Sequence, residues 1–127
     1  MVHMFLNGGG MRGGPLHHQL CGAPLVREAR TAPRYRFYSV NDQFPALDPV
    51  PAGGVAVHGE VYDVPLETLR DSLLPAEPAE LEFGVIELDD GSASLAVLLR
   101  REYHHTARLT EISEIAAWRT YQEGQRE

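Results

Sequence analysis

The chain has 127 residues, a net charge of -7 from 11 basic and 18 acidic side chains, and 43% hydrophobic residues. This length is typical of one globular domain, expected here over residues 1–127, and the acidic balance argues against a nucleic-acid-binding surface. All the basic residues are arginines, which excludes Schiff-base lysines, P-loop lysines and Ser-Lys dyads.

Cysteine usage and the N-terminal residues indicate the compartment. Cys21 is the only cysteine, so the chain forms no internal disulfide and offers no set of thiolates to a metal. The N-terminal apolar run reaches a glycine at Gly8, too early for the hydrophobic region of a signal peptide or for a membrane-spanning helix. We therefore expect a cytoplasmic protein that does not contact a membrane.

The first elements are a strand, a glycine-rich loop and a helical turn. Residues 2–6 are a short apolar run, which predicts a buried strand. Residues 7–14 include five glycines and end that strand. Pro15 can occupy the first position of a helical turn over residues 15–20, where no hydrogen-bond donor is lost.

Strands are also predicted in the middle of the chain. The Tyr, Phe and Val content of residues 25–31 and 34–40 predicts an antiparallel pair joined at Ala32-Pro33. Residues 41–54 are rich in proline and glycine, so a loop is expected there. Residues 55–64 alternate regularly and predict a further strand.

The second half predicts two helices and a hairpin. Residues 65–74 form a short helix ended by Pro75 and Pro78. Residues 81–88 and 94–99 form a β-hairpin, because the Asp90-Gly91 step supplies the positive φ that its turn needs. A last helix is expected to begin at Thr110. Its apolar stripe is Ile112, Ile115, Trp118 and Tyr121.

Together these elements predict an α+β fold. Strands outnumber helices, and the hairpin is antiparallel. We expect a mainly antiparallel, mixed sheet that curls into a small barrel, with two or three short helices.

The glycine-rich loop is the first candidate for function. A loop of this composition after a buried strand exposes backbone N–H groups that can bind a carboxylate or a developing oxyanion. Gly8, Gly9 and Gly10 are the best-placed donors, and the alternative is an ordinary flexible turn. If the loop binds anions, its amides should open into a cavity that also contains Tyr62 or Arg34.

Four ordered motifs resemble the γ-glutamylcyclotransferase-like superfamily. They are Phe5-Leu6-Asn7-Gly8-Gly9-Gly10-Met11-Arg12-Gly13, Arg30-Thr-Ala-Pro-x-Tyr35-Arg-Phe-Tyr38, Val57-His-Gly-Glu-Val-Tyr62 and Leu73-Leu-Pro-Ala-Glu77. Within that superfamily, the second motif and Pro15-Leu16-x-x-Gln19-Leu20 most resemble the C-terminal domain of allophanate hydrolases. The resemblance implies a γ-glutamylcyclotransferase-like fold and an enzyme of the lyase or acyl-transferase type.

The resemblance also implies a mechanism with one glutamate as acid and base. That glutamate deprotonates the α-ammonium of a γ-glutamyl amide, the amine attacks its own γ-carbonyl, and 5-oxoproline and an amine are released. Glu77 falls at the catalytic position, and Glu80 is its competitor. Such a carboxylate needs a partly dry pocket that raises its pKa. The alternative is that both are solvated loop acids.

Other residues are expected to contact the substrate. They are Asn7, Met11, His17, Arg34, Tyr35, Glu60 and Tyr62. The adjacent histidine pairs at 17–18 and 104–105 point in different directions, so no metal site is expected. We expect no cofactor either.

Three functions therefore remain open. The first is a γ-glutamylcyclotransferase-like enzyme. The second is an enzyme or accessory domain of the allophanate-hydrolase C-terminal type, acting on a small carboxylated urea or amide. The third is a non-catalytic binding module with the same fold. In each case we expect a small ligand with a carboxylate or amide, no nucleic acid, and a monomer or homodimer.

Overall fold

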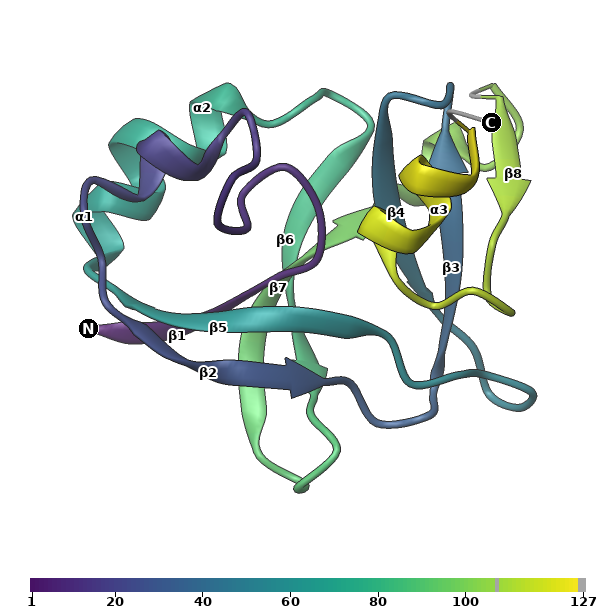
Figure 1. Ribbon diagram of the computed structural model, residues 1–127, viewed down its shortest axis with the longest axis horizontal. Coiled ribbons are helices and arrows are strands. Elements are labelled where there is room, and N and C mark those ends of the chain that lie inside the picture. Colours follow the sequence, from purple (N-terminus) through teal and green to yellow (C-terminus); the bar gives the residue numbers. More distant parts are fainter. Residues whose placement is uncertain (107, 126–127) are drawn as a thin grey trace.

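The computed structural model describes residues 1–106 and 108–125. In these ranges eight strands form one mixed sheet in the order β2-β5-β1-β7-β4-β3-β8, with β6 paired to β7 (Figure 1). The strands are β1 (Val2–Leu6), β2 (Leu25–Arg30), β3 (Tyr35–Val40), β4 (Phe44–Pro49), β5 (His58–Val64), β6 (Leu81–Glu87), β7 (Ala93–Leu99) and β8 (Leu109–Glu111).

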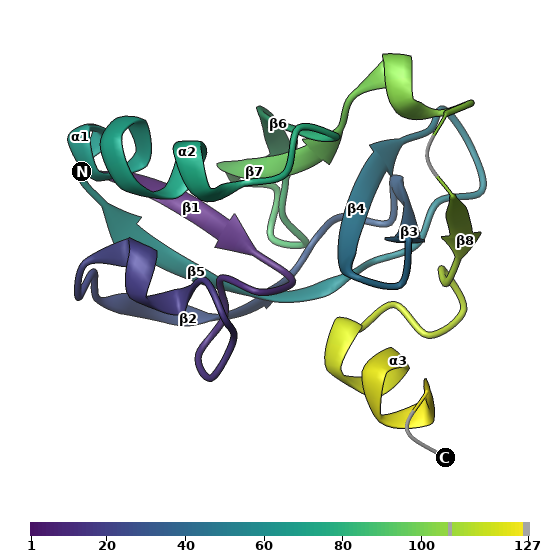
Figure 2. The same ribbon diagram turned by 90° about the horizontal axis from the view of Figure 1, so that it is seen from above.

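The sheet is curled, and β7 joins its two parts. β7 pairs with β6 along its whole length, and it runs parallel to β1 at Leu95 and to β4 at Leu98, while all other strand pairs are antiparallel. Figures 1 and 2 show β2, β5 and β1 in one part and β4, β3 and β8 in the other. The predicted α+β class with a mainly antiparallel, curled sheet is confirmed.

The helices are short. They are the 3₁₀ turns η1 (His17–Leu20) and η3 (Arg101–Tyr103), the helix α3 (Trp118–Gln125), and a continuous helical segment made of α1 (Leu66–Thr68), the π-helical turn η2 (Leu69–Leu73) and α2 (Leu74–Ala76). None of the helices in the described ranges is long and apolar enough to span a membrane.

The helical segment continues past the expected end at Leu74. In a regular α-helix a proline ring collides with the carbonyl four residues earlier. Here the N–H of Leu74 bonds to the carbonyl of Leu69, five residues back, so the turn before Pro75 is widened. This π geometry changes the position of the preceding carbonyls and lets the helix run to Ala76.

The hairpin of β6 and β7 is confirmed. The strands pair from Leu81 opposite Leu99 to Glu87 opposite Ala93. Gly91 has φ +86° and donates its N–H to the carbonyl of Leu88 at 3.0 Å. The Asp-Gly step therefore makes the turn expected of it.

The predicted pairing of residues 25–31 with 34–40 is wrong. β2 pairs with β5, whereas β3 pairs with β4 and β8. Ala32 donates its N–H to the carbonyl of Glu87 at 2.9 Å, which ties this part of the chain to β6. The segment at Pro33 is therefore a crossover between the two parts of the sheet instead of a hairpin turn.

The loop expected over residues 41–54 contains β4. Val50 donates its N–H to the carbonyl of Arg34 at 3.0 Å. Because backbone groups alternate along a strand, Pro45 and Pro49 then fall at positions whose N–H would point away from β3. On that far side only one residue of β4 pairs with β7, so the prolines remove no bond from the β3–β4 ladder.

The last helix does not begin at Thr110. That residue lies in β8, and the next apolar residue, Ile112, donates its N–H to the carbonyl of Phe37 at 2.8 Å. Ala116 then adopts φ +56°, which breaks any continuous helix, and α3 begins at Trp118. Long-range pairing with β3 has overridden the local helical pattern.

One cluster of buried apolar side chains forms the core. Burial of each large side chain contributes roughly 1.5–3 kcal/mol. Leu69 and Leu73 join this core from the helical segment, while Leu66 of the same segment is 59% exposed. Through these two leucines the segment packs on the sheet, and it delivers Glu77 directly after Ala76.

Candidate active site

The glycine-rich loop presents unpaired backbone donors. Its carbonyls fold it back on itself: Gly8 accepts from the N–H of Met11 at 3.1 Å, and Gly9 accepts from the N–H of Leu16 at 2.8 Å. Within the described ranges, no protein acceptor bonds the N–H groups of Gly8, Gly9 or Gly10. Three consecutive free N–H groups are suited to an anionic oxygen.

Close packing explains the glycines. A Cβ on Gly8 would lie 2.6 Å from Cγ of Pro45, and a Cβ on Gly14 would lie 2.3 Å from the carbonyl oxygen of Gly9. Both distances are below van der Waals contact. The loop thus needs glycine to fold tightly against β4 and against itself.

A cavity of about 380 Å³ lies beside this loop. Its walls come from β1, β4, β7, α3 and the end of the helical segment, which flank the loop in Figure 1. The polar residues that matter for the chemistry are Asn7, Gly8, Gly9, Gly10, Glu77 and Arg119. The chain thereby brings the free loop amides and one carboxyl group into the same cavity.

Glu77 is held at the end of α2. Its backbone is extended, at φ -77° and ψ 147°, and its N–H caps the helix by donating to the carbonyl of Leu74. The carboxyl group has no hydrogen-bond or ionic partner among the described residues, and burial raises its pKa to about 7. Near neutral pH it therefore populates both the acid and the base form, as proton transfer requires.

Asn7 also borders this cavity, but its amide nitrogen is buried. The residue is 7% exposed, and its Nδ2 group has no hydrogen-bond partner in the described part of the chain. An unpaired buried amide nitrogen is costly to the fold, and because this nitrogen has no accessible surface, a ligand in the cavity does not contact it in this conformation.

α3 supplies residues that sequence reasoning missed. Arg119 and Gln122 line the cavity together with Trp118. Arg119 also donates from Nη2 to the carbonyl of Arg12, which fastens α3 to the loop. Only Trp118 carried a sequence signal, as part of an apolar stripe, because nothing local relates α3 to a loop more than a hundred residues earlier.

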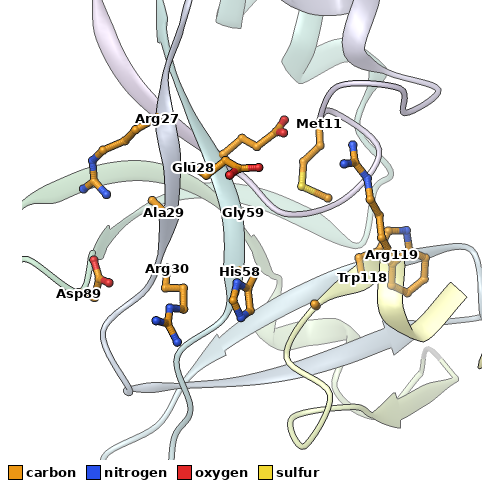
Figure 3. Close-up of a pocket in the computed structure, with 12 residues that line it drawn as sticks. Met11, Arg27, Glu28, Ala29, Arg30, His58, Gly59, Asp89, Trp118 and Arg119 are labelled. Carbon is orange, nitrogen blue, oxygen red and sulfur yellow. The ribbon is translucent and has the colours of Figure 1, made fainter. Parts of the chain in front are cut away.

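A second cavity, of about 370 Å³, also borders the loop. Figure 3 shows it between β2 and β5 on one side and Trp118 and Arg119 of α3 on the other. Met11 and Glu60 line it. Burial alone would raise the pKa of Glu60, but hydrogen bonds from Arg12 and Tyr62 lower it below its ordinary value. Glu60 is therefore ionised near neutral pH and is not suited to proton transfer. Because Glu77 lines the first cavity, that cavity is the candidate active site.

Other predicted contacts lie outside the first cavity. Tyr62 is 1% exposed, with its ring 5.6 Å from the ring of His17, whose Nδ1 donates to the carbonyl of Gly10. Arg34 pairs with Glu87. Neither Tyr62 nor Arg34 lines the cavity of the loop amides, so that expectation is wrong. Both are occupied by neighbouring protein groups.

The last two predicted residues are also engaged elsewhere. Tyr35 is buried and its hydroxyl accepts the N–H of Glu87 at 2.9 Å. Glu80 does not line the cavity, and its carbonyl accepts from the N–H of Arg100. Over residues 1–106 and 108–125, no group of three or more His, Cys, Asp or Glu side chains is arranged to hold a metal ion.

The curled mixed sheet with a glycine-rich loop after its first strand is the γ-glutamylcyclotransferase-like fold. The family model of the allophanate hydrolase C-terminal domain matches residues 2–123, and the chain belongs to that family. No curated protein sequence matches it.

Solved structures agree with this assignment. A uropathogenic E. coli-specific protein is 38% identical, with a TM-score of 0.88 over 96% of this chain and 95% of that one. Kluyveromyces lactis allophanate hydrolase is 25% identical, with a TM-score of 0.87 over 97% of this chain but only 21% of that one. An AIG2-like protein of Mus musculus, 21% identical, shares the fold with a TM-score of 0.62 over 84% and 80% of the two chains.

Proposed function

We propose that the chain is an enzyme that breaks a C–N bond of a small carboxylated urea or amide, with Glu77 as the acid/base residue. One observation carries this proposal: Glu77, with its pKa raised to about 7, lines the same cavity as Gly8, Gly9 and Gly10, and among residues 1–106 and 108–125 neither its carboxyl group nor the three glycine N–H groups have a partner. The similarity to an allophanate hydrolase supports the substrate class.

The chemistry follows from the two groups. The N–H groups of Gly8, Gly9 and Gly10 bind the urea or amide carbonyl oxygen. The bond between the nitrogen and the carboxylate carbon then breaks, and carbon dioxide leaves. The electron pair of that bond stays on the nitrogen and is delocalised onto the neighbouring carbonyl oxygen, where the loop amides stabilise the negative charge. Glu77 in its acid form donates a proton to the nitrogen, and solvent reprotonates it.

A second reaction, γ-glutamyl cyclotransfer, is also compatible with Glu77, because this reaction needs one carboxyl group to act as both base and acid. In that reaction ionised Glu77 takes a proton from the α-ammonium, and the amine attacks the γ-carbonyl. The loop amides stabilise the resulting oxyanion, and Glu77 returns the proton to the departing amine as 5-oxoproline forms. The two reactions use opposite starting forms of Glu77.

The experiment measures carbon dioxide and 5-oxoproline separately. The chain is incubated with small N-carboxylated ureas and with γ-glutamyl amides between pH 5 and 9. For the first reaction kcat/KM falls as pH rises through about 7, the pKa of Glu77. For the second reaction it rises through the same region. If no compound of either class yields carbon dioxide or 5-oxoproline, both proposals are contradicted.

The variant that tests the role of Glu77 is Glu77→Gln. It keeps the shape of the side chain but cannot transfer a proton, so kcat should fall by a factor of about 10² or more. Glu67→Gln is the matched control, because Glu67 lies in the same helical segment with its side chain exposed. Full activity of Glu77→Gln would remove Glu77 from the mechanism, and loss of activity in Glu80→Gln instead would transfer the role.

A further inference from the structure

Glu60 is a buried carboxylate that the proposed chemistry does not use. It lies in β5 and is 2% exposed. Its Oε1 accepts the backbone N–H of Arg12 at 2.8 Å and the hydroxyl of Tyr62 at 2.8 Å, and its Oε2 accepts Nε of Arg12 at 3.0 Å. A charge buried this deeply is tolerated only with such partners.

These bonds converge on the glycine-rich loop. Arg12 follows Gly10 by two residues, and both its backbone and its side chain are held by Glu60. Tyr62, the other residue that bonds Glu60, packs against the ring of His17, which donates to the carbonyl of Gly10. One carboxylate is therefore connected to the loop at two points on either side of Met11.

We propose that Glu60 is a positioning residue: it fixes the glycine-rich loop from β5 so that the N–H groups of Gly8, Gly9 and Gly10 face the cavity of Glu77. Glu60 lines the second cavity and Glu77 the first, and loop residues border both. It acts on the loop without touching the substrate. The effect on catalysis rests on the proposed function, whereas the effect on the loop does not.

The opposite environments of the two glutamates suit these roles. Both carboxylate oxygens of Glu60 accept hydrogen bonds from Arg12 or Tyr62. These bonds lower its pKa and so favour its ionised form. Glu77 has no partner among the described residues, and burial raises its pKa to about 7. The loop therefore stays anchored through the pH range in which Glu77 gains or loses its proton.

The test compares three Glu→Gln variants. In Glu60→Gln, the new amide group turns a donor toward the Arg12 or Tyr62 donors. Hydrogen exchange of peptides covering residues 7–16 should then accelerate about tenfold or more, as expected for losing a charge-assisted hydrogen bond. The kcat/KM for the substrate should fall by a similar factor, with the pH midpoint of Glu77 unchanged.

The other two variants separate loop anchoring from chemistry. Glu28 also pairs with the Arg12 side chain, at 3.3 Å, but it is exposed and does not bond the backbone. Glu28→Gln should therefore change neither readout. Glu77→Gln should lose activity while the exchange of residues 7–16 stays at the wild-type rate.

The outcomes that would overturn the proposal are distinct. Wild-type exchange of residues 7–16 in Glu60→Gln would remove the anchoring role, and lost kcat/KM with unchanged exchange would make Glu60 a substrate contact. If Glu60→Gln unfolds, Tyr62→Phe decides, because it removes one of the three bonds: exchange must rise in the loop and not in β6 or β7. If no substrate is found, the proposed function fails but the exchange result still stands.

Discussion

At the scale of single residues, Glu77 opposes folding when it is ionised. It loses water on folding and gains no partner within the described ranges, so its pKa rises from 4.5 to about 7. The folded state then binds a proton more tightly than the unfolded chain between these two pH values. The contribution of Glu77 to the free energy of unfolding therefore decreases as pH rises through this window, and it levels off above about 7.

This sign predicts that Glu77→Gln stabilises the protein at high pH. Removing the buried charge should raise the free energy of unfolding at pH 8.5 by up to about 3 kcal/mol, since each pKa unit corresponds to about 1.4 kcal/mol. Below about pH 4.5 the wild-type carboxyl group is neutral and the difference should nearly vanish. Urea unfolding of both proteins at the two pH values measures it. An equal difference at both would show that the charge of Glu77 is not the cause.

At the scale of elements, the glycine-rich loop depends on close backbone contacts. Gly14→Ala would bring a methyl group 2.3 Å from the carbonyl oxygen of Gly9, so it should destabilise the protein by roughly 1–3 kcal/mol, as overpacking does.

Gly124→Ala is the opposite case. Gly124 lies in α3, and a Cβ added there would have no described atom within 4 Å. Alanine should stabilise this helix by up to about 1 kcal/mol. Thermal unfolding of Gly14→Ala and Gly124→Ala checks both signs. Destabilisation by both would mean that the loop contact is not what distinguishes Gly14.

Elements set by local chemistry could be predicted from the sequence. The β6–β7 hairpin follows from Asp90-Gly91, and β1 follows from a short apolar run. β4 and β8 were missed because both exist through pairing with β3, and proline or a helical stripe gave the opposite local signal. Local signals fail where the partner strand decides the conformation.

The candidate site divides in the same way. The loop glycines and Glu77 lie in recognisable sequence motifs, and the structure brings both to one cavity. Arg119 and Gln122 carry none, because only the docking of α3 puts them there. Tyr62 and Arg34 were expected at this cavity, but neighbouring residues bond both side chains.

At the scale of the whole molecule, the cavity is built from distant parts of the chain. Its walls include residues of β1, β4, β7 and α3. A ligand that fills it therefore links both parts of the curled sheet. Because it binds only the folded state, it stabilises the whole protein by mass action, by about 2.7 kcal/mol at a concentration a hundred times its Kd.

Trp118 allows this binding to be observed. It is the only tryptophan of the chain, it is 4% exposed, and it lines both cavities. An inert carboxylate such as malonate should therefore change the emission of Trp118 when it binds the loop amides. Wild type and Glu77→Gln can be titrated in the same way.

The affinity for malonate should depend on pH through Glu77. Above pH 7 the ionised carboxyl group repels a second carboxylate in the same cavity, and two like charges a few ångströms apart in a partly dry site interact by more than about 1.4 kcal/mol. In the wild type, Kd should therefore be about tenfold higher at pH 8.5 than at pH 5.5. In Glu77→Gln that dependence should disappear while binding persists. Equal wild-type affinity at both pH values would mean that the anion does not bind beside Glu77.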